Sequence, residues 1–123
     1  MPGFDEKQYV HAYDQFFQGN LDPLREMTAE EYVAHIPSLD MSVRGREQAF
    51  EALRQVIQTM NVQSRLERVE SHGDFLVGFV SGRSDVRGEF TGVDIIRVNE
   101  EGRAVEAYLH RNPLPPGADL PTG

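Results

Sequence analysis

The 123-residue sequence contains no cysteine, which excludes disulfide bonds, thiolate catalysis and cysteine-ligated metal sites. It also lacks any apolar stretch near the roughly 18 residues that span a bilayer. The N-terminal MPGFDEKQYV has neither the basic start nor the apolar run of a secretion signal. The net charge is −8, whereas nucleic acid requires a clustered basic surface. We therefore expect a cytoplasmic protein that binds neither nucleic acid nor membrane.

Several motifs that bind metals, nucleotides or ester substrates are missing as well. No histidine–carboxylate pattern has the spacing of metal ligands on one helical face. There is no phosphate-binding loop of the G-x-x-x-x-G-K-[ST] type and no G-x-S-x-G turn. The sequence predicts neither a metal nor a cofactor.

The first half of the chain is patterned as helices. Between residues 5 and 18, apolar side chains recur three and four positions apart, which predicts a helix that Asp5 caps and Gly19 ends. Asp22 and Pro23 are typical of an N-cap and a first helical position, so we expect a second, short helix through Met27. A third helix is predicted after Gly45 from the apolar stripe Ala49, Phe50, Leu53, Val56, Ile57 and Met60.

The segment 28–37 allows two interpretations. Thr28 to Glu31 fits a capping box, which would start another helix. Residues 32–36 are aromatic and β-branched and run into Pro37, which favours an extended chain. We expect a short strand over 32–36.

The second half is patterned as four long strands, at 62–71, 75–85, 89–99 and 103–111. Short glycine-containing separators between them are typical of hairpin loops, so the strands should form an antiparallel meander. Helices followed by strands indicate an α+β fold with the helices packed on one face of the sheet. We expect one domain over 1–111 and a proline-rich tail over 112–123.

Asp94 is the most unusual residue of the predicted sheet, because strand alternation places it on one face with Ile96 and Val98. A buried carboxylate pairs with a cation or becomes a neutral hydrogen-bond donor. Asp94 could therefore serve an apolar pocket as an acid, or be bonded to backbone, Arg97 or another arginine. Since the opposite face is also apolar, a second subunit could cover it. The small Ala107 on the next strand would leave space under the helices.

Four segments carry a family resemblance: FFQGNLDPL at 16–24, YVAHIP at 32–37, RGREQA at 44–49 and VDIIRVNEEGRAVE at 93–106. Their order and spacing resemble the nuclear transport factor 2-like superfamily, in its SnoaL-like polyketide cyclase and ketosteroid isomerase branches. The resemblance implies a cone, in which helices close over a curved sheet and leave a pocket for a small apolar ligand. It also implies a homodimer formed through the outer sheet face.

The resemblance implies further that Tyr13 and Asp94 stand where the isomerase has two hydrogen-bond donors for a substrate oxygen. The sequence departs from that pattern at the general base, where Ile36 replaces an aspartate and His35 is its neighbour. Histidine can move a proton near neutral pH. Consecutive strand residues point to opposite faces, so both can enter the pocket only if a bulge precedes Pro37. We assign the substrate-binding wall to Phe17, Ile36, Phe50, Ile96, Ala107 and Leu109.

The leading functional hypothesis is a cofactor-free enzyme of the cyclase or isomerase type that acts on a small apolar carbonyl-containing or polyketide-like substrate. His35 would move a proton, while Tyr13 and Asp94 would stabilise an enolate-like oxygen. Two alternatives use the same fold: a non-catalytic ligand-binding or dimerisation module, and an epoxide hydrolase-like enzyme. Fold alone does not choose among them.

Overall fold

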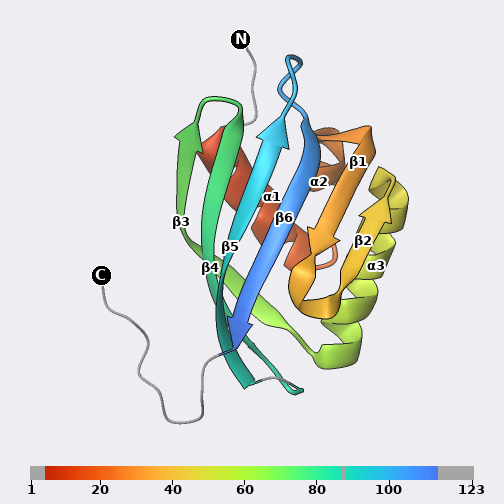
Figure 1. Cartoon of the computed structure of the whole chain (residues 1–123), viewed down its shortest axis with the longest axis vertical. Helices are drawn as coiled ribbons and strands as arrows, with labels where there is room; N and C mark the ends of the chain where they lie inside the picture. The colour runs from red at the N-terminus through yellow and green to blue at the C-terminus, as the bar shows by residue number, and fades with distance from the viewer. Residues whose placement is uncertain (1–4, 87, 114–123) are drawn as a thin grey trace.

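The structure is a computed structural model that describes residues 5–86 and 88–113. The described residues form three α-helices and a six-stranded curved sheet, whose arrangement can be followed in Figure 1, so the expected α+β class is confirmed. The elements are α1 (Glu6–Phe17), α2 (Asp22–Glu26), β1 (Thr28–Ile36), the 3-10 turn η1 (Pro37–Leu39), β2 (Met41–Arg44), α3 (Arg46–Met60), β3 (Gln63–His72), β4 (Phe75–Ser84), β5 (Gly88–Val98) and β6 (Ala104–Pro113).

The helices begin and end close to where the sequence predicts. Asp5 caps α1 by accepting a 2.7 Å hydrogen bond from the backbone nitrogen of Gln8, and the Gln8 side chain accepts one from the Asp5 backbone in return. In α2, Asp22 is the first helical residue rather than the N-cap, which is Leu21. Helix α3 follows Gly45, whose φ of +95° is readily adopted only by glycine.

The sheet has the order β2-β1-β6-β5-β4-β3. Strands β3 to β6 form the expected antiparallel meander. Strand β1 is longer than expected and pairs in parallel with β6, and β2, which was not predicted, pairs with β1 at the edge. The sheet is therefore mixed. Thr28 opens β1 instead of capping a helix, since its hydroxyl donates a 2.6 Å bond to the Leu24 carbonyl.

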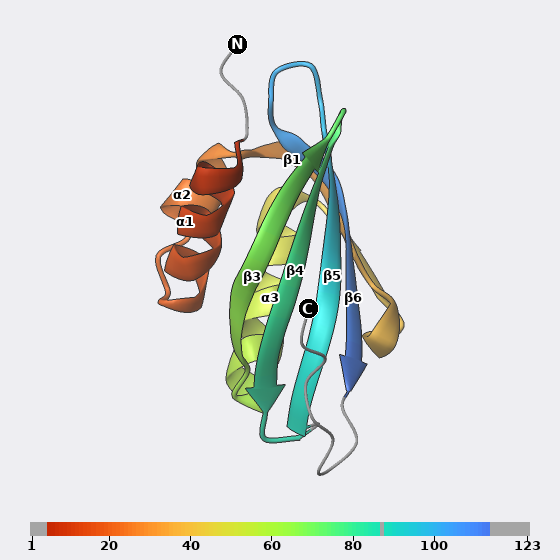
Figure 2. The same ribbon diagram turned by 90° about the vertical axis from the view of Figure 1, so that its left-hand side faces the viewer.

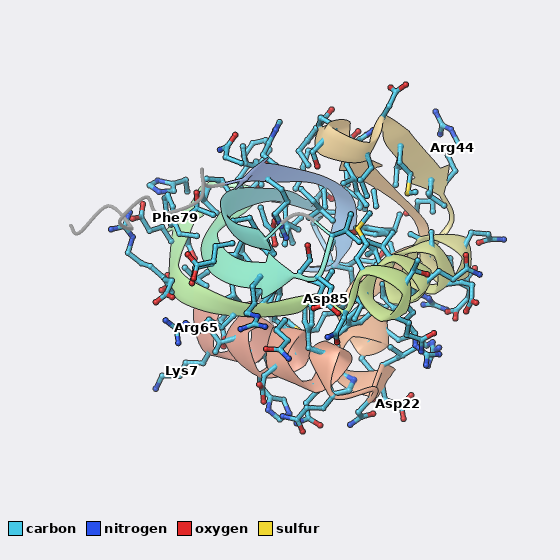
Figure 3. All side chains as sticks on the ribbon, turned by 90° about the horizontal axis from the view of Figure 1, so that it is seen from below. Lys7, Asp22, Arg44, Arg65, Phe79 and Asp85 are labelled. Carbon is cyan, nitrogen blue, oxygen red and sulfur yellow. The ribbon has the colours of Figure 1, made fainter. Side chains whose placement is uncertain are left out.

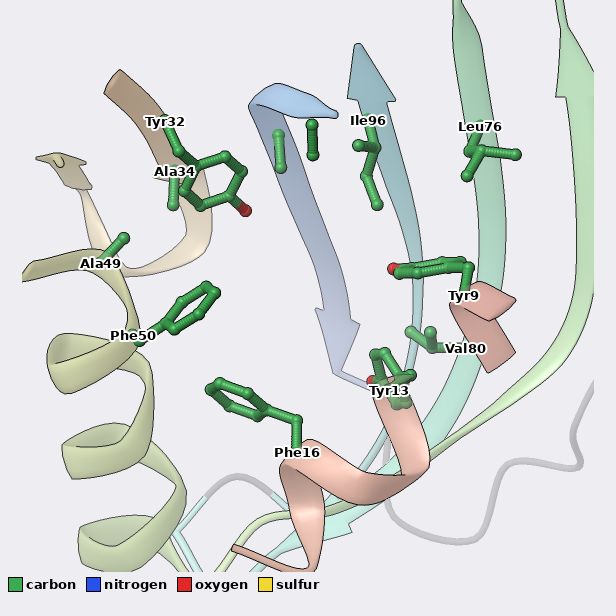
Figure 4. Close-up of a cluster of buried hydrophobic side chains, with 12 residues drawn as sticks. Tyr9, Tyr13, Phe16, Tyr32, Ala34, Ala49, Phe50, Leu76, Val80 and Ile96 are labelled. Carbon is green, nitrogen blue, oxygen red and sulfur yellow. The ribbon is translucent and has the colours of Figure 1, made fainter. Parts of the chain in front are cut away.

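Helices α1, α2 and α3 lie on the concave side of the curved sheet (Figures 2 and 3). The buried face of α1 meets inward-facing sheet residues and the start of α3 in one core (Figure 4). None of the described helices combines the length and apolar character needed to cross a membrane.

The outer face of the sheet carries apolar side chains too. Phe75 and Tyr108 are 42% and 41% exposed. The half-buried residues Val77, Phe79, Val93 and Ile95 lie on the same face of β4 and β5. At the C-terminal end, β6 continues through Pro113, two residues into the predicted tail. The rest of that tail, 114–123, lies outside the described residues.

Candidate functional site

A cavity of about 160 Å³ lies between the concave face of the sheet, α1 and α3. Its volume is close to the ~150 Å³ of an apolar cavity that holds benzene, so it suits a molecule of about one ring. Most of its lining is apolar. The exceptions are Tyr9, Tyr13, Thr28, Tyr32, Ser38, Ser84, Asp94 and Arg111.

Asp94 and Arg111 form the charged centre of this cavity. Asp94 is only 1% exposed, and its Oδ1 accepts a 2.6 Å hydrogen bond from Nη1 of Arg111. Its Oδ2 accepts a longer bond of 3.3 Å from the Tyr9 hydroxyl. Both contacts use Asp94 as an acceptor, so its carboxylate can be buried because a cation and a phenol replace the water that it loses.

Two glycines make room for the partners of Asp94. Gly92 is paired with Arg111 across β5 and β6, and a Cβ atom at Gly92 would lie 2.8 Å from Cδ of Arg111. Gly78 is paired with Asp94 across β4 and β5, and a Cβ there would lie 3.2 Å from Cε2 of Tyr9. Arg111 therefore reaches Asp94 diagonally across a position that has no side chain.

Three tyrosines of the cavity remain phenols at neutral pH. Burial, followed by the negative charge of Asp94, raises the pKa of Tyr9, Tyr13 and Tyr32 well above the usual value for tyrosine. The Tyr13 hydroxyl is 2.6 Å from Oγ of Ser64 on β3. Burial opposes the charge on Arg111, but the Asp94 carboxylate raises the pKa of Arg111 overall. The cavity thus combines neutral phenols with one ion pair.

Six of the predicted site residues line this cavity: Tyr13, Phe17, Ile36, Asp94, Ile96 and Leu109. Phe50 and Ala107 belong instead to the fully packed core. The Phe50 ring packs edge-on against Phe16 and Tyr32, which leaves it behind the cavity wall.

His35 lies outside the cavity, contrary to the expectation that it carries a proton there. The pairing of β1 with β2 is continuous from Val33 to Ile36, so no bulge turns His35 inward and strand alternation sends only Ile36 into the cavity. On the outer face, Nε2 of His35 is 2.9 Å from Glu106 and Nδ1 is 2.8 Å from Ser42. Its ring stacks on Tyr108 at 4.5 Å between centroids.

Sequence reasoning missed Tyr9, Tyr32 and Arg111 as site residues. Two of them had a usable signal: Tyr9 is one helical turn before Tyr13, and Arg111 continues the alternation of Ala107 and Leu109. The sequence had left Asp94 either as an acid or as the partner of an arginine. The structure supports the second interpretation, with Arg111 rather than Arg97 as the partner. Within the described ranges, no three side chains of the metal-binding types gather as ligands would.

Residues 7–107 match the family model of the SnoaL-like domain. The chain belongs to this family. Solved structures that resemble this SnoaL-like domain include Bal32a from a soil-derived mobile gene cassette, with a TM-score of 0.76 and 18% identity over 85% of this chain and 86% of that one. No curated protein matches the chain in sequence.

Two further structural neighbours have an activity in their names. IdmH from Streptomyces antibioticus, to which polyketide cyclase activity is ascribed, has a TM-score of 0.70 and 20% identity, covering 86% of this chain and 90% of that one. A steroid delta-isomerase from Pseudomonas aeruginosa has a TM-score of 0.71 and 19% identity, covering 93% and 85%. At these identities the neighbours establish that this SnoaL-like domain has the nuclear transport factor 2-like fold.

Proposed function

We propose that this protein is a cofactor-independent enzyme that moves protons in a small, mostly apolar carbonyl compound, as cyclases and isomerases do. The observation that carries the proposal is the Asp94–Arg111 ion pair at the wall of an otherwise apolar cavity. A charged pair shielded from water acts more strongly on a bound substrate than the same pair would in solution.

In the proposed reaction, the Asp94 carboxylate takes a proton from the carbon next to the substrate carbonyl. The electrons of that C–H bond move to the carbonyl oxygen, where Arg111 and the Tyr13 phenol stabilise the resulting enolate. Return of the proton to another carbon gives isomerisation, whereas attack of the enolate carbon on a second carbonyl gives cyclisation. Asp94 replaces His35 as the proton carrier in this scheme, because His35 faces away from the cavity.

Two observations support this reaction class over the others. Proteins named for cyclase and isomerase activity share the fold. Among the described residues that line the cavity, Asp94 is the only carboxylate, whereas epoxide hydrolysis by an acid and a base calls for more than one. The cavity volume favours a substrate of about one ring.

Deuterium exchange tests the proposal without knowledge of the natural substrate. Small cyclic and aryl ketones in deuterated buffer should incorporate deuterium next to the carbonyl faster with the wild-type protein, as followed by proton NMR. Asp94→Asn should lose this acceleration, and Asp74→Asn, in the exposed β3–β4 turn, should keep it. Circular dichroism on each variant separates lost chemistry from lost folding. Equal exchange with and without protein would contradict the proposal.

The main alternative is a non-catalytic ligand-binding domain. One observation favours it: both oxygens of Asp94 already accept a hydrogen bond, so the pair could simply stabilise the cavity. Ketones would then bind, as calorimetry would detect, but no variant would change an exchange rate that the protein does not accelerate.

We also propose that the protein forms a homodimer through the outer face of the sheet. The support is the apolar surface around Phe75 and Tyr108, which no described element of the same chain covers.

A further inference from the structure

Tyr32 differs from the other phenols of the cavity, because its hydroxyl has no partner among the described residues. The side chain is 7% exposed and lies on β1 among the inward-facing residues. By contrast, the Tyr9 hydroxyl donates to Asp94 and the Tyr13 hydroxyl is bonded to Ser64. The Tyr32 ring meets Phe50 edge-on, and its hydroxyl end lies at the cavity that the residue lines.

The Tyr32 hydroxyl is open to the cavity, because every fully buried side-chain oxygen or nitrogen of the described residues has a hydrogen-bond partner. A tyrosine hydroxyl without a protein partner bonds to whatever fills such a space. Burial and the nearby Asp94 charge raise the pKa of Tyr32, so the group is a neutral phenol that can both donate and accept. Because the described residues supply no hydrogen-bond partner for this hydroxyl, the molecules that fill the cavity must supply one. The hydroxyl is therefore placed to bind a polar atom of a ligand.

The position of Tyr32 separates this atom from the reactive centre. Strand β6 lies between β1 and β5, so Tyr32 and Asp94 stand two strand spacings apart, about 10 Å, across the sheet. The register also displaces them by about four residues along β6, because Val33 pairs with Glu106 and Asp94 with Leu109. Figure 4 shows the hydroxyl oxygens of Tyr32 and Tyr9 pointing into the space between them from opposite sides. On the side of the cavity near Asp94, Arg111 and Tyr13 can bond to a ligand oxygen, whereas the Tyr9 hydroxyl donates to Asp94 itself.

We infer that the natural ligand carries two separated oxygen functions: a carbonyl held at the Asp94–Arg111 pair, and a hydroxyl or second carbonyl held by Tyr32. This inference rests on the proposed function, in that the cavity must bind a small carbonyl compound. It narrows the substrate class to about one ring with oxygens on opposite sides. Tyr32 is then a positioning and specificity residue, because it contacts the far end of the substrate.

A matched pair of ligands tests this assignment: 4-hydroxyacetophenone and 4-methylacetophenone, which have similar size and differ in one hydrogen-bonding group. Calorimetry or ligand-observed NMR should show that the wild-type protein prefers the hydroxy compound by about fivefold, the value of one neutral hydrogen bond. Tyr32→Phe should abolish this preference without weakening the methyl compound. Tyr108→Phe, the same change on the outer face, should leave the preference intact. Since Tyr32→Phe breaks no internal hydrogen bond, its melting temperature should stay close to that of the wild type.

The outcomes separate this inference from the proposed function. A preference that survives in Tyr32→Phe, or equal binding of both compounds by the wild type, would overturn the role of Tyr32 while the carbonyl site stands. If neither compound binds, both ideas are overturned. If the preference for the hydroxy compound depends on Tyr32 but the protein does not accelerate deuterium exchange, the two-oxygen ligand is supported and catalysis is contradicted.

Discussion

Asp94 is a carboxylate almost completely removed from water, and individual residues around it make this possible. Arg111 supplies the opposing charge and is itself only 21% exposed in its side chain. Replacing either residue by an uncharged one would leave the other as an unpaired charge in an interior that solvates charge poorly.

The mutual dependence of the pair predicts strong coupling between substitutions. Asp94→Leu or Arg111→Met alone should lower the free energy of unfolding by about 3 kcal/mol, because each leaves an unpaired buried charge. The double variant should lose much less than the sum of the two. Urea unfolding of the four proteins measures this cycle, and losses that simply add would show that the two groups are not coupled.

The buried tyrosines predict a loss of stability in alkaline solution. Because the pKa of Tyr9, Tyr13 and Tyr32 is raised in the folded protein above the value of 10.0 for the free side chain, the unfolded chain gives up these protons first. Stability is therefore fully present below pH 10 and falls above it, by about 1.4 kcal/mol per tyrosine for each pH unit.

Unfolding free energies measured from pH 9 to pH 11 test this dependence. The fall should be shallower by one tyrosine in Tyr32→Phe than in the wild type. Identical curves for the two proteins would mean that the Tyr32 phenol ionises as readily in the folded chain as in the unfolded one.

At the scale of secondary-structure elements, the site depends on which strands pair and in what register. Arg111 reaches Asp94 because β5 and β6 are aligned with Gly92 opposite Arg111. A shift of one residue would send one of the two charges to the outer face.

Gly92→Ala should therefore disturb the ion pair without touching either charge. Its new methyl group would meet the backbone carbonyl oxygen of His110 as well as Cδ and Nη1 of Arg111, and such overpacking costs about 1–3 kcal/mol. Thr91→Ala, one residue earlier on the opposite face, is the matched control and should cost less. Urea unfolding compares the two, and equal losses would contradict the route proposed for the arginine.

The same scale shows what the sequence could and could not predict. Periodicity and caps located α1 and α3, and glycine-containing loops located the four-stranded meander, because these signals are local. Strand β2 has only Met41–Arg44, too few residues for alternation to be recognised. The parallel pairing of β1 with β6 joins segments far apart in the chain, and no local pattern encodes it.

The candidate site also contains residues that local patterns could predict and residues whose place depended on long-range strand pairing. Asp94 was recognisable as a carboxylate on an apolar strand face, and Ile96 and Leu109 followed from alternation. The direction of His35 and Ile36 depended on whether β1 contains a bulge before Pro37. The partner of Asp94 depended on the register of β5 against β6, and Arg111 stood at the edge of a predicted tail.

At the scale of the whole molecule, the helices cover the concave face of the sheet, whereas no described element covers its outer face. The outer face also carries an ionic cluster in which Glu106 has its pKa lowered, first by the hydrogen bond from His35 and then by the charges of His35 and Arg97. Apolar residues flank this cluster, which is the composition expected of a surface that pairs with a second copy.

A charge placed on the outer face should separate the proposed dimer. Phe75→Glu and Tyr108→Glu each place a carboxylate where the proposed interface would remove it from water, so sedimentation velocity should show a shift from dimer to monomer. Val10→Glu, at an exposed position of α1, is the control and should remain dimeric. A wild-type protein that sediments as a monomer at all accessible concentrations would contradict the dimer.

The cavity with its ion pair is the centre of the proposed function, and a crystal structure soaked with a one-ring hydroxy-ketone such as 4-hydroxyacetophenone examines it most directly. The expected result is ligand density inside the cavity, with the carbonyl oxygen within hydrogen-bond distance, about 3 Å, of Arg111 or Tyr13 and the far hydroxyl at Tyr32. A cavity that stays without ligand density at saturating ligand, or density only on the outer face, would contradict the proposal that this cavity is the functional site.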